Sequence, residues 1–309
     1  MSHSHNHSNN KGLSVAFWLN FTFSIIELIG GTLTNSTAII ADAFHDFTDA
    51  LAIGLAVLLE KISGKKRSAK FSYGYRRFSL LSAAAMSIFL LVGAAFMCFS
   101  AYKSFIEPEV VDSKGMLWLA VLGIAVNGLA FLKIKNFKKD AHSHHGHTHT
   151  HGTDYNSKAI MLHLLEDVLG WVAVLIGAWV IYMTGWFWID GLLALAIAAF
   201  IGYNATRNLI STLSILLQSV PESIDPDQLT KELLEIKEIK NIHGLHVWTL
   251  DGGYNIGTLH AVVNTTDTSS LDNILSSILK MMEKHKIQHP TVQIETELTK
   301  CKLTDEFKY

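Results

Sequence analysis

Long apolar stretches fill the first two thirds of the chain, and a mixed polar pattern follows them. A helix that crosses the hydrocarbon core of a bilayer needs about 20 mostly apolar residues. Six stretches of about that length are present, near residues 13–33, 36–59, 78–102, 116–134, 159–183 and 187–206. The links at 34–35 and 184–186 are too short to return across a bilayer, so each predicts a helical hairpin. The pattern therefore predicts an α-helical membrane protein with six transmembrane helices.

After Pro221 the pattern becomes that of a small soluble domain. Amphipathic helical patterns at 225–239 and 269–285 alternate with β-rich runs, which lie at 243–250, 254–263 and 291–298. The sequence Asp251-Gly252-Gly253 between the first two runs is a hairpin signal. The order αββαβ favours a small sheet with both helices on one face. We expect three parts: an N-terminal tail at 1–12, a six-span domain at 13–210 and a C-terminal α+β domain at 211–309.

Charge decides the expected orientation and excludes some partners. Only 17% of the 309 residues are charged and 49% are hydrophobic, and a formal net charge of −2 gives no general attraction to nucleic acid. Two cysteines cannot form a disulfide framework, and we expect no cleaved signal peptide. Basic residues gather in two links, at Lys61, Lys65, Lys66, Arg67, Lys70, Arg76 and Arg77 and at Lys133, Lys135, Lys138 and Lys139. By the positive-inside rule, we expect both termini in the cytoplasm. We also expect the chain to lie in the cell (inner) membrane.

Ionisable residues inside apolar helices are costly in lipid, so each is a candidate for function. One spacing occurs twice: His45 and Asp49 are four residues apart in the second stretch, and His163 and Asp167 repeat it in the fifth. Residues four apart lie on one face of a helix. Two opposed faces of this kind offer two imidazoles and two carboxylates, a set suited to tetrahedral Zn²⁺. The competing interpretation is a group of hydrogen bonds between helices.

Other acidic residues in the apolar stretches are assigned supporting roles. Asp46 and Glu166 are neighbours of the four candidate ligands and are expected as outer-shell or approach groups. Asp42 and Asp190 lie near stretch ends, which favours helix-end or access-path roles. Glu27 lies beside Gly30-Gly31, where a neighbouring helix can approach closely. It is equally compatible with a structural hydrogen-bonding partner and with a proton carrier.

Two histidine tracts lie on the expected cytoplasmic side. His3, His5 and His7 begin the chain, and the link at 140–156 holds six more, at His142, His144, His145, His147, His149 and His151. Histidine alternating with Ser, Thr and Gly cannot form a packed core. We expect these tracts to capture or sense metal with low affinity, and the alternative is an inert solvated linker.

Several motifs together match one known family. They are Glu27 with Gly30-Gly31, Asp42-Ala43-Phe44-His45 through Asp49, Tyr73-Gly74-Tyr75 with Arg77, His163 to Asp167, and His246-Val247-Trp248-Thr249-Leu250. The chain resembles the cation diffusion facilitators, six-span metal/proton exporters that include the zinc transporters, over nearly its whole length. The resemblance implies that the transport site is His45, Asp49, His163 and Asp167, and the mixed His/Asp set resembles the zinc-preferring group.

The resemblance also implies a homodimer with a metallochaperone-like C-terminal domain that binds metal. The matching positions there are His246, His260, Glu295 and Glu297. The residues support this in part, because the two histidines fall on adjacent predicted strands and the two glutamates share one face of the third. His243, His285 and His289 receive no role. Ser79 and Met86 depart from the family's pattern, and Cys301 stands without the second cysteine found in some members.

These observations predict a divalent metal exporter. We expect a Zn²⁺/H⁺ antiporter that moves zinc out of the cytoplasm, with no enzymatic activity and no organic cofactor. Cd²⁺, Co²⁺ and Ni²⁺ stay open as substrates because ligand preferences overlap. The alternatives are a membrane-embedded metal-dependent enzyme, although the stretches contain no HExxH motif, and a metal-gated sensor or channel. The chain contains no Walker A sequence, which argues against ATP-driven pumping.

Overall fold

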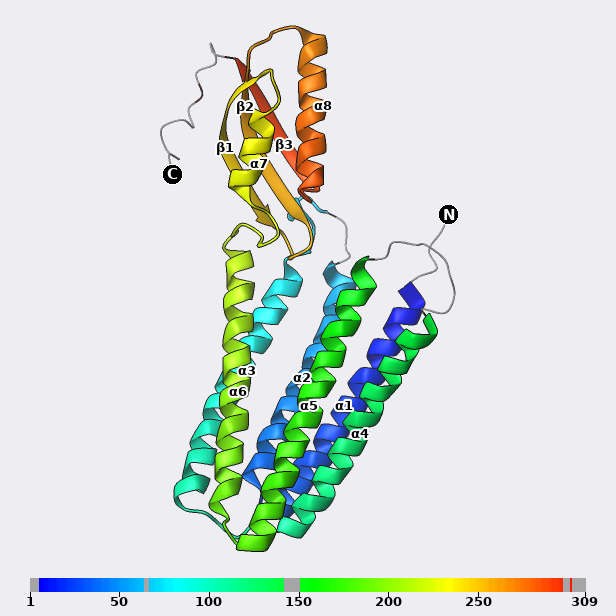
Figure 1. The fold of residues 1–309 in the computed structure, drawn as a ribbon, viewed down its shortest axis with the longest axis vertical. Coiled ribbons are helices and arrows are strands. Elements are labelled where there is room, and N and C mark those ends of the chain that lie inside the picture. The colour runs from blue at the N-terminus through cyan, green and yellow to red at the C-terminus, as the bar shows by residue number, and fades with distance from the viewer. Residues whose placement is uncertain (1–5, 64–66, 142–150, 297–300, 302–309) are drawn as a thin grey trace. The chain divides into compact units, whose positions relative to one another are not determined.

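Two compact units make up the protein (Figure 1). A computed structural model describes residues 6–63, 67–141, 151–296 and 301, and it describes no side chains at 6–16, 19, 53, 56–57, 60–63, 130, 133–141 and 151–164. The first unit contains residues 1–57 and 86–207, and the second contains residues 58–85 and 208–309. The first unit is therefore built from the helical region, and the second includes the sheet.

Six long helices occupy the described part of the region before residue 217. They are α1 (Asn6–Thr34), α2 (Thr37–Ser63), α3 (Phe78–Ile106), α4 (Ser113–Ala141), α5 (His151–Thr184) and α6 (Trp188–Leu216). Among the described residues, Phe78–Ile106, Leu165–Thr184 and Trp188–Leu216 are long and apolar enough to cross a membrane, and Ser113–Leu129 is a shorter apolar helix. The prediction of six helices is confirmed, although α6 continues about ten residues beyond its apolar window through polar residues such as Arg207.

The first unit packs around large apolar side chains from several helices. Trp171 of α5 is 1% exposed and meets Phe23 of α1 edge to face, with ring centroids 6.1 Å apart. On α4, a Cβ at Gly123 would collide with the Trp171 ring, so glycine lets the two helices approach. Outward-facing residues are also apolar, including Phe99 and Trp118, which are 74% and 77% exposed. An exposed apolar surface of this kind matches contact with lipid.

The start of α2 is fixed by a carboxylate from α6. Asp190 is completely buried, and its Oδ1 accepts a hydrogen bond of 2.6 Å from Ser36 Oγ. Its Oδ2 accepts one of 2.7 Å from the Thr37 amide, and the Ala38 amide lies 3.4 Å from Oδ1. The first amides of a helix have no partner within that helix. Asp190 therefore caps α2 from another element, as its position near a stretch end predicted.

The second unit contains the small α+β domain. Its elements are α7 (Pro226–Leu234), β1 (Ile239–Thr249), β2 (Asn255–Val263), α8 (Thr268–Lys284) and β3 (His289–Thr296). The sheet order is β1-β2-β3, with β1 antiparallel and β3 parallel to β2. Apolar residues of both helices, including Leu233 and Ile278, pack with Leu259 and Ala261 of β2 in one core. The predicted αββαβ order, with both helices on one face, is confirmed.

One boundary differs from the sequence expectation. The amphipathic pattern extends to 239, but α7 ends at Leu234 and β1 already begins at Ile239. The side chain of Ile239 is 6% exposed and belongs to the same core as Leu233. Burial of Ile239 in the sheet therefore overrides the helical pattern of residues 235–238.

Candidate metal centres

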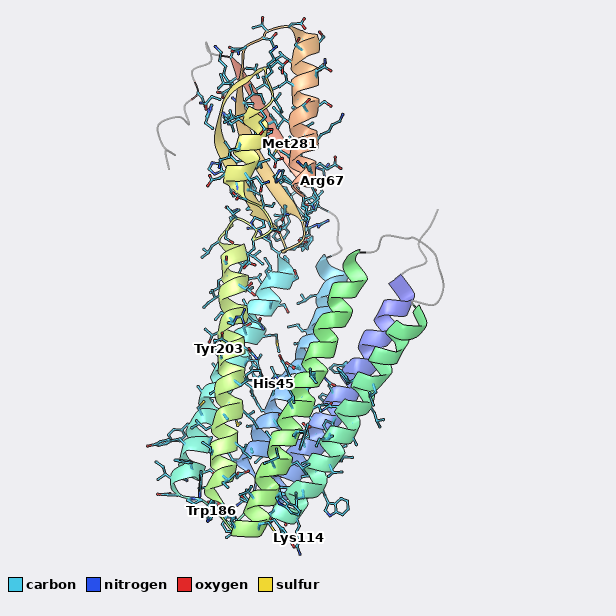
Figure 2. All side chains as sticks on the ribbon, viewed as in Figure 1. His45, Arg67, Lys114, Trp186, Tyr203 and Met281 are labelled. Carbon is cyan, nitrogen blue, oxygen red and sulfur yellow. The ribbon has the colours of Figure 1, made fainter. Side chains whose placement is uncertain are left out.

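The first candidate centre begins on α2, where His45 and Asp49 lie on one helix face. Their Nε2 and Oδ2 atoms are 3.7 Å apart, and the two side chains are 23% and 22% exposed. His45 lies well inside the helical region, far from its ends (Figure 2). Both side chains are thus partly enclosed and close enough to contact one ion.

The other two candidate ligands, His163 and Asp167, belong to α5. His163 lies in α5 one helical turn before Asp167, and its side chain is outside the described residues. Asp167 is half-buried and interacts electrostatically with Asp42 and Asp46 of α2. A Cβ at Gly170 of α5 would lie 4.0 Å from Asp42 Oδ1. Asp167 of α5 therefore lies near the acidic side chains of α2 in the first unit.

Acidic side chains from three helices gather in that region. Glu27 of α1 is 1% exposed. It interacts electrostatically with Asp42 and Asp167 and shares a hydrogen bond with Asp46. Asp46 is 6% exposed and also interacts with Asp49. Several carboxylates buried together need cations or protons to balance their charge, so this region fits the binding of a divalent ion.

The remaining auxiliary candidates separate by exposure. Asp42 is half-buried near α5, whereas Glu166 is exposed. The six histidines of the link at 140–156 lie outside the described residues or have undescribed side chains, as does the N-terminal tract. The structure thus brings Glu27, Asp42 and Asp46 close to the expected ligands.

The second candidate centre lies on the sheet of the C-terminal domain. One ligand atom from each of His243, His260, Glu295 and Cys301 lies within 4.8 Å of the others, and we call these four residues the C-terminal cluster. His260 Nδ1 is 2.7 Å from Glu295 Oε1, and His243 Nε2 is 3.3 Å from Glu295 Oε2. Cys301 Sγ is 3.4 Å from His260 Nδ1. The carboxylate joins the two imidazoles, and the sulfur lies on the His260 side.

Strand register explains why these residues meet. His243 of β1 is paired directly with His260 of β2, and the ring centroids are 5.0 Å apart. Alternate β2 residues such as Leu259 face the helical core, so His260 faces the opposite side of the sheet. Gln293 of β3 pairs with His260, and its Nε2 donates a 3.0 Å hydrogen bond to Glu295. The cluster therefore occupies the sheet face that the helices leave uncovered.

The C-terminal cluster differs from the expected ligand set in two members. His260 and Glu295 belong to both, but His243 and Cys301 occur in place of His246 and Glu297. His246 pairs with Thr258, further along β1, and Glu297 lies outside the described residues. A register shift between His243 and His246, with Gly244 at φ 59°, inserts one extra β1 residue. The sequence offered one signal for this bulge, a glycine between the two histidines, because glycine adopts the left-handed conformation found here without strain.

The two other histidines without a predicted role have partners elsewhere in the second unit. His285 Nε2 is 3.1 Å from Glu232 Oε2, and Lys284 donates a 2.8 Å hydrogen bond to the same oxygen. Hydrogen bonds from Lys284, His285 and Gln228 lower the pKa of Glu232 from 4.5 to about 2. His289 packs against the ring of Tyr73. The Glu232 carboxylate already has three hydrogen-bonding partners, so it is not a candidate metal ligand.

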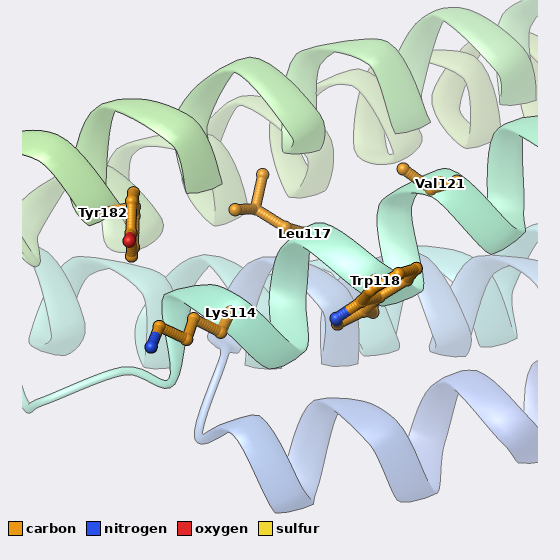
Figure 3. A pocket seen from close by; sticks show the side chains of 5 residues that line it. All are labelled: Lys114, Leu117, Trp118, Val121 and Tyr182. Carbon is orange, nitrogen blue, oxygen red and sulfur yellow. The ribbon is translucent and has the colours of Figure 1, made fainter.

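A hollow on the outside of α4 and α5 has no metal-binding chemistry. Figure 3 shows its lining, which consists of Lys114, Leu117, Trp118, Val121 and Tyr182. The Lys114 ammonium lies 5.9 Å from the centroid of the Tyr182 ring. None of these side chains is a carboxylate, imidazole or thiol, so the hollow is not a candidate metal centre.

Comparison with known proteins covers nearly the whole chain. The cation efflux transmembrane domain family matches residues 13–217, and the cation efflux protein cytoplasmic domain family matches residues 221–297. The metal cation efflux system protein CzcD of Cupriavidus metallidurans is 32% identical over 306 residues, which are 98% of this chain and 92% of the relative. The cadmium, cobalt and zinc/H(+)-K(+) antiporter of Bacillus subtilis is 33% identical over 303 residues, covering 96% and 93%.

Two further matches are a zinc transporter and a solved domain of a metal transporter. The zinc transporter ZitB of Escherichia coli is 31% identical over 305 residues, which are 96% of this chain and 93% of the relative. A solved metal-bound C-terminal domain of the Cupriavidus CzcD transporter is 30% identical and covers 23% of this chain and 99% of its own, with a TM-score of 0.21. The relatives are named as transporters and not as enzymes, which confirms that prediction. The chain belongs to the cation efflux family and is a divalent metal cation efflux transporter of the membrane, with a six-helix region followed by a cytoplasmic α+β domain.

Proposed function

We propose that the protein exchanges Zn²⁺ for protons, with the ion held by His45, Asp49, His163 and Asp167, which we call the intramembrane set. Two observations support this: His45 and Asp49 share one face of α2, and Asp167 of α5 interacts with Asp42 and Asp46 of the same helix. Two imidazoles and two carboxylates suit tetrahedral zinc, with Zn–N near 2.0–2.1 Å and Zn–O near 2.0–2.2 Å. The relatives named as zinc transporters support the choice of ion.

Protonation of the ligands provides the exchange. Zinc binds neutral imidazole and ionised carboxylate, so its binding releases protons and protons in turn displace it. A histidine with an ordinary pKa near 6.5 changes protonation within the physiological range. The neighbouring carboxylates Glu27, Asp42 and Asp46 are buried or half-buried, and buried carboxylates need either protons or a cation to balance their charge, so protons and the metal ion compete for the same region. Alternating access to the two sides of the membrane then couples zinc export to proton entry.

Orientation and assembly belong to the same proposal. We propose that the protein lies in the inner membrane of a bacterial cell. Its basic links favour an orientation with both termini in the cytoplasm, by the positive-inside rule. We propose a homodimer, in keeping with a C-terminal family that is named for a dimer. Zinc thus leaves the cytoplasm, where the histidine tracts can capture it with low affinity.

A second metal ion is proposed for the C-terminal domain, at His243, His260 and Glu295. Both ring nitrogens of His243 are buried and make no hydrogen bond with a described residue. Glu295 is 2% exposed and lies between the two imidazoles. Buried polar atoms normally have partners, so an orphaned imidazole beside a buried carboxylate fits a metal ligand. A bound ion would tie β1, β2 and β3 together and make this domain responsive to cytoplasmic metal.

Flux measurements test the intramembrane set. Purified protein is reconstituted in proteoliposomes, and Zn²⁺ movement against its gradient is followed when a proton gradient is imposed. We expect saturable, proton-driven flux in the wild type and none in Asp49→Ala. The matched control is Glu107→Gln, in the exposed link after α3, which should keep the wild-type rate.

The same assay separates the alternatives. A channel would carry zinc only down its gradient, whatever the proton gradient. Wild-type flux in both Asp49→Ala and Asp167→Ala would contradict the ligand assignment while leaving the family assignment intact. Parallel runs with Cd²⁺ and Co²⁺ rank the metals.

A further inference from the structure

The thiol of Cys301 lies beside the central strand of the sheet. Cys301 lies five residues after Thr296, where β3 ends, yet its sulfur is beside His260 on the central strand β2. All four ligand atoms of the C-terminal cluster lie within 4.8 Å of one another. Four ligands around one tetrahedral zinc ion are about 3.3–3.8 Å apart, given the usual Zn–N, Zn–O and Zn–S distances. The observed spacing thus needs only a small contraction to close on an ion.

A hydrogen bond between the thiol and His260 does not account for this arrangement by itself. The same Nδ1 atom is 2.7 Å from Glu295 Oε1 and 3.4 Å from Cys301 Sγ. If Nδ1 carries a proton it donates to the carboxylate, and then it has no lone pair to accept from the thiol. The carboxylate, which is 2% exposed, also lies 3.3 Å from His243. Several acceptor atoms crowd around one point, and a cation at that point satisfies them together.

We infer that Cys301 is the fourth ligand of the proposed C-terminal metal site and that its thiolate makes the site selective for thiophilic divalent ions, Cd²⁺ and Zn²⁺, over Mn²⁺ and Mg²⁺. This rests on the proposed binding of metal at His243, His260 and Glu295. Thiolate is a soft ligand that favours zinc and cadmium, whereas carboxylate and water suit manganese and magnesium. Without the sulfur, two imidazoles and one carboxylate discriminate less between these groups of ions.

Cadmium provides a direct spectroscopic test, because a thiolate bound to Cd²⁺ gives a sulfur-to-metal charge-transfer band in the ultraviolet. Full-length reduced protein in detergent is stripped with a chelator and titrated with Cd²⁺ alone. The chain offers a matched control, since its other cysteine, Cys98, lies in α3 and outside the cluster. We expect the band in the wild type and in Cys98→Ser, and its loss in Cys301→Ser. Cys301→Ala serves as a second variant if the serine form does not fold.

Competition between ions tests the selectivity. In the Cys301→Ser protein we expect at least about a tenfold loss of Cd²⁺ affinity at the C-terminal site, with little change for Mn²⁺. A band that persists in both Cys301 variants, or a wild type without one, overturns the inference. The proposed site fails separately: it is wrong if His260→Ala binds as many Cd²⁺ ions per chain as the wild type does.

Discussion

The intramembrane set and the C-terminal cluster use similar side chains in different surroundings. On α2, His45 and Asp49 are each more than a fifth exposed and 3.7 Å apart, with extra carboxylates nearby. In the C-terminal cluster, the shared carboxylate of Glu295 is 2% exposed and makes contacts of 2.7 and 3.3 Å. A transport site must release its ion in every cycle, whereas a structural or sensing site holds it. Partial access, with neighbouring carboxylates that can take up protons in place of the ion, fits release. A compact set around a buried carboxylate, with a thiolate beside it, fits retention.

The largest effect is expected from removal of a ligand in the intramembrane set. Asp49→Ala takes away one of two carboxylates that neutralise the ion, so proton-driven Zn²⁺ flux should fall to the background of empty liposomes. The same protein should still bind Cd²⁺ with the charge-transfer band of the C-terminal cluster. Loss of that band together with flux would show that the two centres are not independent.

Ligand removal in the C-terminal cluster should have the opposite pattern. We expect His243→Ala to lose one bound metal ion per chain in equilibrium dialysis, because an imidazole paired directly with His260 is gone. Most of the flux should remain. His246→Ala is the matched control, and it should keep the metal, since this residue pairs with Thr258 outside the cluster. The reverse result would favour the ligand set expected from the sequence over that seen in the structure.

A smaller effect is expected at the start of α2. Asp190→Ala leaves buried amides of α2 and the Ser36 hydroxyl without their acceptor, which should cost about 1–3 kcal/mol of stability. Because α2 carries His45 and Asp49, flux should weaken while cadmium binding by the C-terminal cluster is unchanged. Thermal unfolding followed by intrinsic fluorescence measures the loss. Asp225→Ala removes the matched cap of α7 in the other unit and should leave flux unaltered, whereas equal flux defects would contradict a specific role for Asp190.

The smallest effect concerns acid stability of the C-terminal domain. The folded pKa of Glu232 is about 2, below its ordinary value of 4.5, because Lys284, His285 and Gln228 hydrogen-bond the ionised form. A lowered folded pKa means that the contribution is fully present above pH 4.5 and is lost as the pH falls toward 2. In Glu232→Gln, the free energy of unfolding should therefore depend less on pH between about 2 and 4.5. Its pH dependence near pH 7 should be the same as in the wild type. Lys284 is 66% exposed, so solvent screens its interaction with Glu232 and the change in stability is small. A steep change in stability near neutral pH would contradict this explanation.

The fold was largely predictable from local patterns. Apolar windows located all six helices, because a bilayer imposes a minimum helix length on the sequence, but several helices extend well beyond their windows through polar residues. The repeated His-x-x-x-Asp spacing placed two pairs of candidate ligands on helix faces, which depends only on 3.6 residues per turn. The end of α7 was less predictable, since the helical pattern of 235–238 loses to the burial of Ile239 in the sheet core.

The C-terminal cluster was only half predictable. His260 and Glu295 followed from strand alternation and family resemblance, but the choice between His243 and His246 depends on a bulge at Gly244. One inserted residue changes which side chain stands opposite a neighbouring strand, and sequence alternation alone does not locate that insertion. Cys301 was not predicted for another reason, because it follows β3 outside any strand, where no regular spacing relates it to His260.

The amino-acid sequence by itself determined the membrane helices and the elements of the small α+β domain, because each follows from a hydrophobic pattern over neighbouring residues. It also supplied the candidate metal ligands, through residue type and spacing. Only the tertiary structure decided that α6 supplies the cap of α2 through Asp190, that carboxylates of three helices share one buried region, and that a histidine, a glutamate and a cysteine from distant segments surround His260. Those arrangements depend on how helices and strands pack against each other, and packing brings together residues whose separation in the chain carries no trace of their distance in space.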